Sequence, residues 1–196
     1  MKAIRIHEHG DIDKLVMEDV EDPKPKTGEV LVKIKAVALN HLDLFVRRGM
    51  EGMKLPLPMI LGSDIAGEIL EVGEGVSHEW VGKRVILNPG YSCGNCSFCW
   101  EGEISLCSKY GILGETRDGG YAELITVPVN QVLELPEGKT FIEGAAFPLV
   151  FLTSWRMLVK RGQIQPMEWV LILGGGAGVG VASIQIAKLF GAKVIA

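Results

Sequence analysis

The sequence has no excess of basic residues and no segment typical of an exported or membrane-spanning protein. Its 196 residues include 20 Lys and Arg against 24 Asp and Glu, a formal net charge of −4. Duplex DNA and anionic membranes attract proteins through basic surfaces, so neither is an expected partner. The stretch MKAIRIHEHGD lacks the apolar core of a signal peptide, and no run of about 18 apolar residues occurs. We therefore expect a cytoplasmic protein.

Cysteine is scarce, and all of it falls in one stretch, CGNCSFCWEGEISLC. The four cysteines have the spacing C-x2-C-x2-C-x7-C and are Cys93, Cys96, Cys99 and Cys107. Such gaps let four thiolates surround one ion. A disulfide is disfavoured in a reducing compartment, and a ferredoxin cluster would place its fourth cysteine nearer and before proline. We favour one zinc ion, and because four thiolates leave no position for substrate, we expect the site to be structural.

The pattern along the chain changes near residue 142. From Met1 to about Thr126 the sequence reads as short strands, such as EVLVKIKAVAL and YAELITV, between Gly-, Pro- and Asp-rich turns. From about Glu143 the apolar spacing is helical, and the strand WVLIL, a glycine turn, a second helix and the strand AKVIA follow. We predict a β-barrel or sandwich over residues 1–142. Residues 143–196 are expected to form a linker helix and one β-α-β unit, so the fold class is α+β followed by α/β.

The turn GGGAGVG joins the predicted strand to the second helix of this unit. The spacing that fits a dinucleotide fingerprint is Gly175, Ala177 and Gly180, with Gly178 and Val179 at the start of the helix. Backbone N–H groups at a helix start suit a cofactor pyrophosphate. A lone glycine fingerprint is also found in tight turns that bind nothing. We favour the dinucleotide-binding interpretation.

Together these motifs resemble the zinc-containing alcohol dehydrogenases of the medium-chain dehydrogenase/reductase superfamily, in particular the quinone-oxidoreductase-like branch. The resemblance covers the whole chain and rests on VKIKAVALNHLDLFVRRG, LPMILGSDIAGEILEVGEGV, the cysteine stretch, DGGYAELITVP and LILGGGAGVGVASIQIAKLFGAKVIA. It implies a GroES-like barrel with a structural zinc lobe, followed by a Rossmann domain that binds NAD(H) or NADP(H). The active site of such enzymes lies between these two domains.

The sequence departs from this family at the catalytic zinc. The positions that match the family's three zinc ligands are Asn40, Ser63 and a residue at or near Leu149, none of them a usual zinc ligand. Asp64 occupies the glutamate position beside the second ligand. A catalytic zinc is therefore not expected, although His41, Asp43 and Asp64 are chemically able to bind a metal.

A site without a catalytic metal fits the chemistry of the quinone-oxidoreductase branch. There the resemblance implies hydride transfer to a quinone or enone, whose conjugation spreads the developing charge. The implied catalytic residues are Asn40 near the nicotinamide, His41 and Asp43 on the substrate side together with Phe45, and Asp64 as a hydrogen-bonding residue of the cleft. For Phe45, ordinary core packing is an equally good interpretation.

The resemblance also implies a cofactor domain longer than the residues present. The acidic residue that meets the ribose should lie about 20 positions past the fingerprint, near Ile195, but no acidic residue follows Glu168. We expect a second copy or a separate polypeptide to cover this partial Rossmann unit. Two functions stay open: an NAD(P)-dependent oxidoreductase acting on alcohols, aldehydes, quinones or enones, or a truncated, non-catalytic zinc-stabilised domain or half of a split enzyme.

Overall fold

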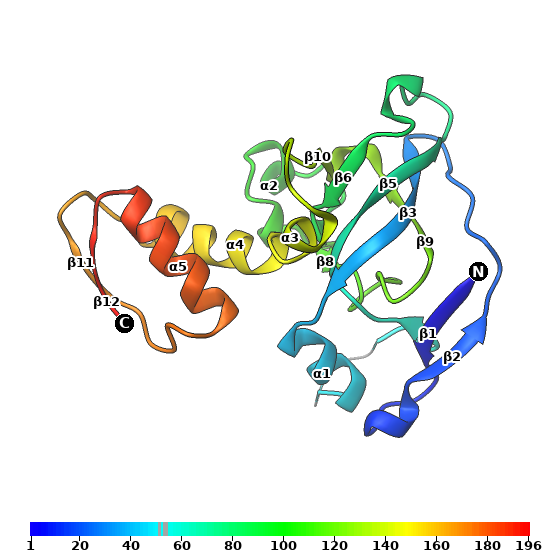
Figure 1. Cartoon of the computed structure of the whole chain (residues 1–196), viewed down its shortest axis with the longest axis horizontal. Helices are drawn as coiled ribbons and strands as arrows, with labels where there is room; N and C mark the ends of the chain where they lie inside the picture. The colour runs from blue at the N-terminus through cyan, green and yellow to red at the C-terminus, as the bar shows by residue number, and fades with distance from the viewer. Residues whose placement is uncertain (51, 53–54) are drawn as a thin grey trace. The chain divides into compact units, whose positions relative to one another are not determined.

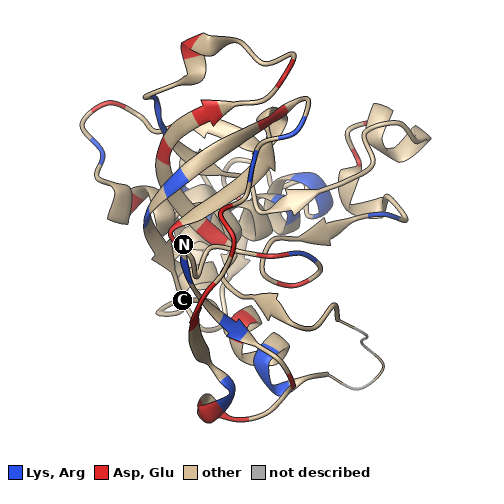
Figure 2. Cartoon of the chain, turned by 90° about the vertical axis from the view of Figure 1, so that its right-hand side faces the viewer, with Lys and Arg blue, Asp and Glu red and all other residues tan. Residues whose placement is uncertain are grey.

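A computed structural model of the chain describes residues 1–50, 52 and 55–196 (Figure 1). The residues form two compact units, Met1–Ala146 and Phe147–Ala196. Each unit is considered by itself below. Figure 2 shows acidic and basic residues interspersed along the strands and turns.

The first unit is built on antiparallel sheets of short strands. Its largest sheet has the order β10-β6-β5-β3-β9, and the smaller ones are β2-β1-β4 and β7-β8. The strands of the largest sheet are β3 (Glu29–Ala38), β5 (Asp64–Val72), β6 (Arg84–Leu87), β9 (Leu124–Pro128) and β10 (Val132–Glu134). The other strands are β1 (Lys2–Ile6), β2 (Val16–Asp19), β4 (Met59–Ile60), β7 (Gly90–Tyr91) and β8 (Gly111–Ile112).

The strands form because β-branched and aliphatic side chains alternate with polar ones along them. On β3, Val30 and Val32 are fully buried while Lys33 and Lys35 are exposed. They share one core with Ile65, Ile69, Val85, Leu87, Leu113 and Val127. Full burial of each such side chain stabilises the fold by about 1.5–3 kcal/mol. This core holds β3 and β5 in register, and the candidate site lies where these two strands meet α1.

Short helices close the ends of the first unit. They are α1 (His41–Arg48), α2 (Ser97–Trp100) and α3 (Phe141–Ala145), with 3-10 turns η1 (Ile12–Lys14), η2 (His78–Trp80), η3 (Ile104–Leu106) and η4 (Val129–Gln131). Helix α3 begins with a capping box in which Thr140 and Glu143 satisfy each other's backbone N–H groups. Bonds from the Thr140 N–H and hydroxyl lower the pKa of Glu143 to about 2.

Two loops cross at unusually short range beside β5. The N–H groups of Gly119, Gly120 and Tyr121 donate to the carbonyls of Ile60, Gly62 and Leu61 at 2.8, 2.8 and 2.9 Å. A Cβ atom on Gly119 would lie 2.2 Å from the Gly62 carbonyl oxygen, and one on Gly62 (φ +95°) would lie 2.5 Å from the Tyr121 ring. Only glycine fits these positions, and the crossing fixes Tyr121 beside the start of β5.

The second unit contains two parallel strands joined by a helix. Helix α4 (Pro148–Trp155) continues into a π-helical segment, η5 (Arg156–Arg161), and is followed by β11 (Trp169–Leu171), α5 (Gly178–Leu189) and β12 (Lys193–Ile195). Strands β11 and β12 pair in parallel. Ser154 of α4 donates to the Val179 carbonyl at 3.0 Å, and Ser183 of α5 donates to Ser154 at 3.1 Å. The small serines bring the two helices close together.

One finding corrects an expectation from the sequence. The stretch Phe141–Arg161, 21 residues long, is long and apolar enough to cross a membrane by length and composition alone. Core helices of soluble proteins meet the same criterion. The run was overlooked because Glu143 and the terminal Arg156, Lys160 and Arg161 interrupt its apolar character in the sequence.

Candidate functional site

The predicted residues Asn40, Asp43 and Asp64 meet at the junction of β3, α1 and β5. Asn40 is the N-cap of α1, and its backbone N–H donates to Asp43 Oδ2 at 2.7 Å. The side-chain amide of Asn40 donates to Asp64 Oδ2 at 3.0 Å. Both carboxylates are buried, with 5% of Asp43 and 1% of Asp64 exposed. Asn40 is therefore fixed between two acids, through its backbone N–H to Asp43 and through its side-chain amide to Asp64.

Tyr121 is a fourth member of this cluster that was not singled out in the sequence. Its hydroxyl donates to Asp43 Oδ2 at 2.8 Å from a position 78 residues further along the chain. Burial, together with the charge of Asp43, raises the pKa of Tyr121. Burial also raises the pKa of Asp43 above its usual 3.8, although hydrogen bonds from the Asn40 N–H, Tyr121 and the Gly62 N–H lower it. The pair therefore retains a proton more readily than either group does in water.

A cavity of about 390 Å³ opens beside the cluster. It is lined by Leu15, Leu39, Asn40, His41, Asp43, Leu44, Arg47, Leu61 and Tyr121. His41 is exposed at its edge, and Phe45 is 48% exposed, so the core-packing interpretation of Phe45 is wrong. The polar groups therefore share one wall of a cavity whose remaining walls are largely leucine.

The other two positions that match the family's catalytic zinc ligands, Ser63 and Leu149, do not line this cavity. Ser63 is fully buried, and its Oγ has no hydrogen-bond partner within the described residues. Leu149 belongs to α4 of the second unit. In the part of the chain that the structure describes, the one group of three or more His, Cys, Asp or Glu side chains able to hold a metal ion is the cysteine cluster.

The four predicted cysteines converge in the lobe that contains α2 and η3. Their sulfur atoms all lie within 4.8 Å of one another. The Sγ atoms of Cys93 and Cys107 are 3.5 Å apart, as are those of Cys96 and Cys99, and Cys93 lies 3.8 Å from Cys99. A tetrahedral zinc with four thiolates requires sulfur separations of about 3.8 Å. The arrangement therefore fits one ion with four sulfur ligands.

The thiols influence one another's protonation. The Ser92 hydroxyl lowers the pKa of Cys99 to about 6. The Asn95 backbone N–H and the Cys107 thiol lower the pKa of Cys93. At Cys96 the Cys99 N–H lowers the pKa, but burial and the neighbouring thiols outweigh it and raise the pKa to about 11. Successive ionisation of such close sulfurs is unfavourable unless a cation joins them.

The glycine turn precedes α5 as predicted from the fingerprint. Ala177 is the N-cap of α5, so the N–H groups of Gly178, Val179 and Gly180 occupy its first turn. A Cβ atom on Gly180 would lie 2.2 Å from the Gly174 carbonyl oxygen and 2.8 Å from Gly175 Cα. The turn therefore depends on glycine at 180 for close packing of helix against strand, and it leaves N–H groups at the helix start where an anion binds well.

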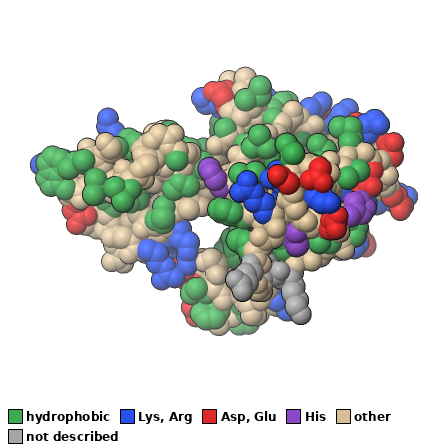
Figure 3. Space-filling view, turned by 90° about the horizontal axis from the view of Figure 1, so that it is seen from below, with side chains coloured by type: hydrophobic (Ala, Val, Ile, Leu, Met, Phe, Trp, Pro, Cys, Tyr) green, Lys and Arg blue, Asp and Glu red, His purple; other side chains and the backbone are tan. Residues whose placement is uncertain are grey.

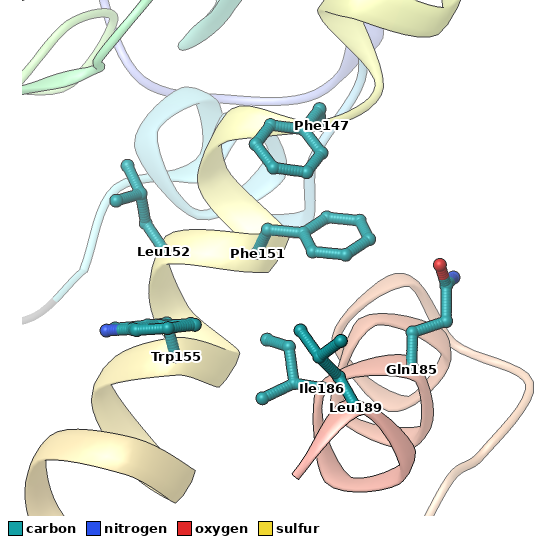
Figure 4. A pocket seen from close by; sticks show the side chains of 7 residues that line it. All are labelled: Phe147, Phe151, Leu152, Trp155, Gln185, Ile186 and Leu189. Atoms are coloured by element: carbon teal, nitrogen blue, oxygen red, sulfur yellow. The ribbon is translucent and has the colours of Figure 1, made fainter.

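A second cavity, of about 460 Å³, lies between α4 and α5 in the second unit (Figure 4). Phe147 and Phe151 stack at 4.3 Å along one side, and Ile186 and Leu189 face them from α5 (Figure 4). Hydrophobic side chains are also exposed elsewhere in this unit (Figure 3), among them Trp169 at 68%, Leu171 at 66% and Leu173 at 85%. The sequence did not predict this cavity, because the residues that line it have the pattern of ordinary apolar helix faces.

Comparison with known proteins assigns the family. Residues 26–137 match the family described as the alcohol dehydrogenase GroES-like domain. The chain belongs to this family. An alcohol dehydrogenase of Geobacillus stearothermophilus is 40% identical over 183 residues, covering 93% of this chain and 54% of the relative. The acryloyl-coenzyme A reductase of Metallosphaera sedula is 35% identical over 198 residues, covering 100% of this chain and 58% of the relative.

Solved structures agree with this assignment to the alcohol dehydrogenase GroES-like family. The crystal structure of an NAD-dependent alcohol dehydrogenase superposes with a TM-score of 0.95 at 46% identity, covering 99% of this chain and 57% of that one. A cobalt- and zinc-bound thermostable alcohol dehydrogenase from Pyrobaculum aerophilum has a TM-score of 0.90 at 34% identity, covering 99% and 58%. The predicted superfamily and the GroES-like fold with a partial Rossmann unit are confirmed. The quinone-oxidoreductase-like branch stays a prediction.

The chain spans about half the length of the curated relatives it matches. The matched GroES-like region, residues 26–137, lies entirely within the first unit. The roles of Asn40, His41, Asp43 and Asp64, and of the glycine turn, stay predictions.

The raised pKa of Asp43 generates a pH-dependence test of the cluster. The folded protein retains this proton to higher pH than the unfolded chain, so the contribution of Asp43 to stability is largest below about pH 4 and falls as pH rises through the folded pKa. Asp43→Asn keeps an oxygen acceptor for Tyr121 and removes the titration. Urea unfolding between pH 4 and 8 should show the variant gaining stability relative to the wild type as pH rises.

Tyr121→Phe is the companion variant for this measurement. It removes a hydrogen bond that lowers the pKa of Asp43, so the fall in stability should extend to higher pH than in the wild type. A difference between Asp43→Asn and wild type that stays constant with pH would show that burial does not perturb this carboxyl.

Proposed function

We propose that this chain provides the substrate-side domain and the start of the cofactor domain of an NAD(P)-dependent oxidoreductase. The reaction is hydride transfer between a nicotinamide and an alcohol or aldehyde, a quinone or an enone. The observation that supports it best is the hydrogen-bonded cluster of Asn40, Asp43, Asp64 and Tyr121, in which Asn40, Asp43 and Tyr121 line a cavity and Asp64 lies buried behind Asn40. Asn40 and Ser63 replace residues that would bind a catalytic zinc in the family, so we propose that chemistry at this site proceeds without one.

The residues of the cluster have distinct roles in this proposal. When bound, the nicotinamide cofactor supplies or accepts the hydride. Asp64 orients the Asn40 amide so that it presents a polar group to a substrate oxygen. Asp43 and Tyr121 hold a proton at the Asp43 Oδ2–Tyr121 hydroxyl bond, where it can be exchanged with the substrate. The leucines that line the cavity provide an apolar surface beside these polar groups.

The names of two relatives indicate different candidate substrates for this chain. The Geobacillus stearothermophilus relative is named an alcohol dehydrogenase, and the Metallosphaera sedula relative is named for acryloyl-coenzyme A. An acryloyl group is a conjugated acyl group, which accepts hydride with its charge spread over the carbonyl. The lack of zinc ligands at Asn40 and Ser63 favours the conjugated class for this chain. The alternative is a non-catalytic, zinc-stabilised domain or half of a split enzyme.

Cys93, Cys96, Cys99 and Cys107 are proposed to hold one structural zinc ion. The sulfur separations match a tetrahedral site, and a solved relative from Pyrobaculum aerophilum is described as cobalt and zinc bound. Zinc would neutralise the thiolates and fold the lobe around α2, which contains few buried apolar residues. Cysteines that bind zinc as thiolates are typical of reducing compartments, which supports a cytoplasmic location.

Metal analysis tests the zinc proposal. We expect one zinc ion per purified chain. A second zinc ion would contradict the proposal that Asn40, Ser63 and Leu149 form no catalytic zinc site. Cys96→Ser should lose most of the metal and destabilise the first unit, because three thiolates leave the ion incompletely coordinated. Ser108→Ala, an exposed change next to Cys107, is the matched control and should retain the metal. Unchanged zinc content and melting in Cys96→Ser would rule out a structural four-cysteine site.

Cofactor titration tests the oxidoreductase proposal. NADH and NADPH should bind the chain, as followed by fluorescence, and Gly180→Val should abolish binding because its side chain would collide with the Gly174 carbonyl. Gln185→Ala, an exposed change on the same helix, should bind as the wild type does. If the wild-type chain binds neither cofactor at millimolar concentration, it is not an enzyme by itself and the non-catalytic alternative is favoured.

We also propose that another polypeptide covers the second unit, either a second copy or a separate chain. The proposal is supported by the two-stranded parallel sheet, whose side chains Trp169, Leu171 and Ile195 are 68%, 66% and 52% exposed. Parallel sheets are normally covered on both faces. Sedimentation velocity should therefore detect a dimer or a stable complex. A monomer at all concentrations that binds no other polypeptide would contradict this proposal.

A further inference from the structure

Arg47, near the end of α1, is a buried cation with little to neutralise it. The residue is 7% exposed and lines the cavity beside Asn40. Its Nε has no hydrogen-bond partner within the described residues, and its Nη2 lies 3.3 Å from Asp11 Oδ1. The Asp11 side chain is 83% exposed, so water competes for that contact. A guanidinium this deeply buried normally has stronger partners.

The nearest acid on the same helix does not serve as that partner. Asp43 precedes Arg47 by four residues and shares its helix face. Its Oδ2 accepts bonds from Tyr121 and from the Asn40 N–H, and no ion pair joins Asp43 to Arg47 in the described part of the chain. Of the other two ionisable side chains that line the cavity, Tyr121 donates to Asp43 and His41 is exposed. The cavity therefore offers a fixed positive charge on one side and, on the other, a carboxyl whose Oδ2 is engaged by Tyr121 and the Asn40 N–H and whose Oδ1 is buried without a partner within the described residues.

The spacing along α1 relates this charge to the proposed reaction site. Four residues correspond to about 6 Å along a helix axis, so Arg47 lies one turn beyond Asp43. A guanidinium binds a carboxylate through two parallel N–H donors. A ligand held there by its carboxylate would place atoms two or three bonds away beside Asp43, Tyr121 and Asn40. The leucine walls suit the short apolar part of such a ligand.

We propose that Arg47 is the specificity-determining residue of this cavity and binds the carboxylate of a short-chain acid that carries the reacting alcohol, carbonyl or conjugated alkene. The assignment rests on the proposed oxidoreductase function for the reaction and names its substrate class. Asp11 forms the ion pair with the Arg47 guanidinium while no substrate is bound. Substrate binding therefore exchanges an exposed carboxylate partner for a buried one.

Binding of propionate to the full chain tests this proposal without cofactor or turnover. Propionamide has nearly the same shape and no charge. Titrations at constant ionic strength, followed by the backbone amide NMR signals of α1, should show propionate binding about tenfold more tightly than propionamide. The carboxylate assignment would be overturned if propionate and propionamide bound equally well. It would also be overturned if chloride or phosphate bound at the same site as tightly as propionate.

Two variants should change this preference in opposite directions. Arg47→Gln removes the charge and should reduce propionate affinity about tenfold without affecting propionamide. Asp11→Asn removes the competing carboxylate from an exposed position and should raise propionate affinity about twofold to fivefold. If circular dichroism shows that Arg47→Gln does not fold, the Asp11→Asn variant provides the test. Propionate affinity in Asp11→Asn that is unchanged or weaker than in the wild type would overturn the proposal.

The outcome is separable from that of the cofactor experiment. Gly180→Val acts in the second unit and should leave propionate binding unchanged. If the wild-type chain binds neither NADH nor NADPH but keeps its preference for propionate, the oxidoreductase proposal is refuted and Arg47 remains a carboxylate site. Cofactor binding with no carboxylate preference would refute the substrate class alone.

Discussion

The backbone contact between residues 60–62 and residues 119–121 positions the polar groups of the candidate site. It is possible only because Gly62 and Gly119 carry no side chain, and three backbone hydrogen bonds hold it. On one side of the contact the chain enters β5 at Asp64, and on the other it presents Tyr121 to Asp43. A side chain at either glycine would separate the loops and disconnect the two acids from their partners.

This rigid crossing explains why buried acids can be tolerated at the site. An isolated buried carboxylate is costly, but Asp43 and Asp64 each accept at least one short hydrogen bond from a group fixed by the crossing or by the α1 N-cap. The strands behind them supply the apolar core that holds this geometry. The cysteine lobe differs, because no residue of α2 or η3 is buried, and the proposed metal coordination by the four thiolates would take the place of a core there.

Much of the site could be predicted from the sequence, since local patterns encode it. Cysteine spacing predicts the convergence of the four thiols, and the glycine pattern predicts the turn before α5. Asn40, Asp43 and Asp64 were placed together by resemblance, whereas Tyr121 was missed because 78 residues separate it from Asp43. Arg47 was missed because an arginine beside Arg48 at a helix end is normally exposed, and only packing reveals that one of the two is buried.

The charge of the first unit makes short-range geometry decisive for its ligands. Of the 24 acidic residues in the chain, all but Glu168 lie in Met1–Ala146, so this unit repels anions at long range. That repulsion is screened beyond about 8 Å at physiological ionic strength, whereas a buried guanidinium contact is screened much less. In the proposal, an anion gains from the first unit where its shape reaches Arg47. Burial makes an unpaired Arg47 guanidinium energetically costly, and it also protects a contact with an anion from screening. In the proposal, an acidic domain can therefore bind a negatively charged ligand at this guanidinium.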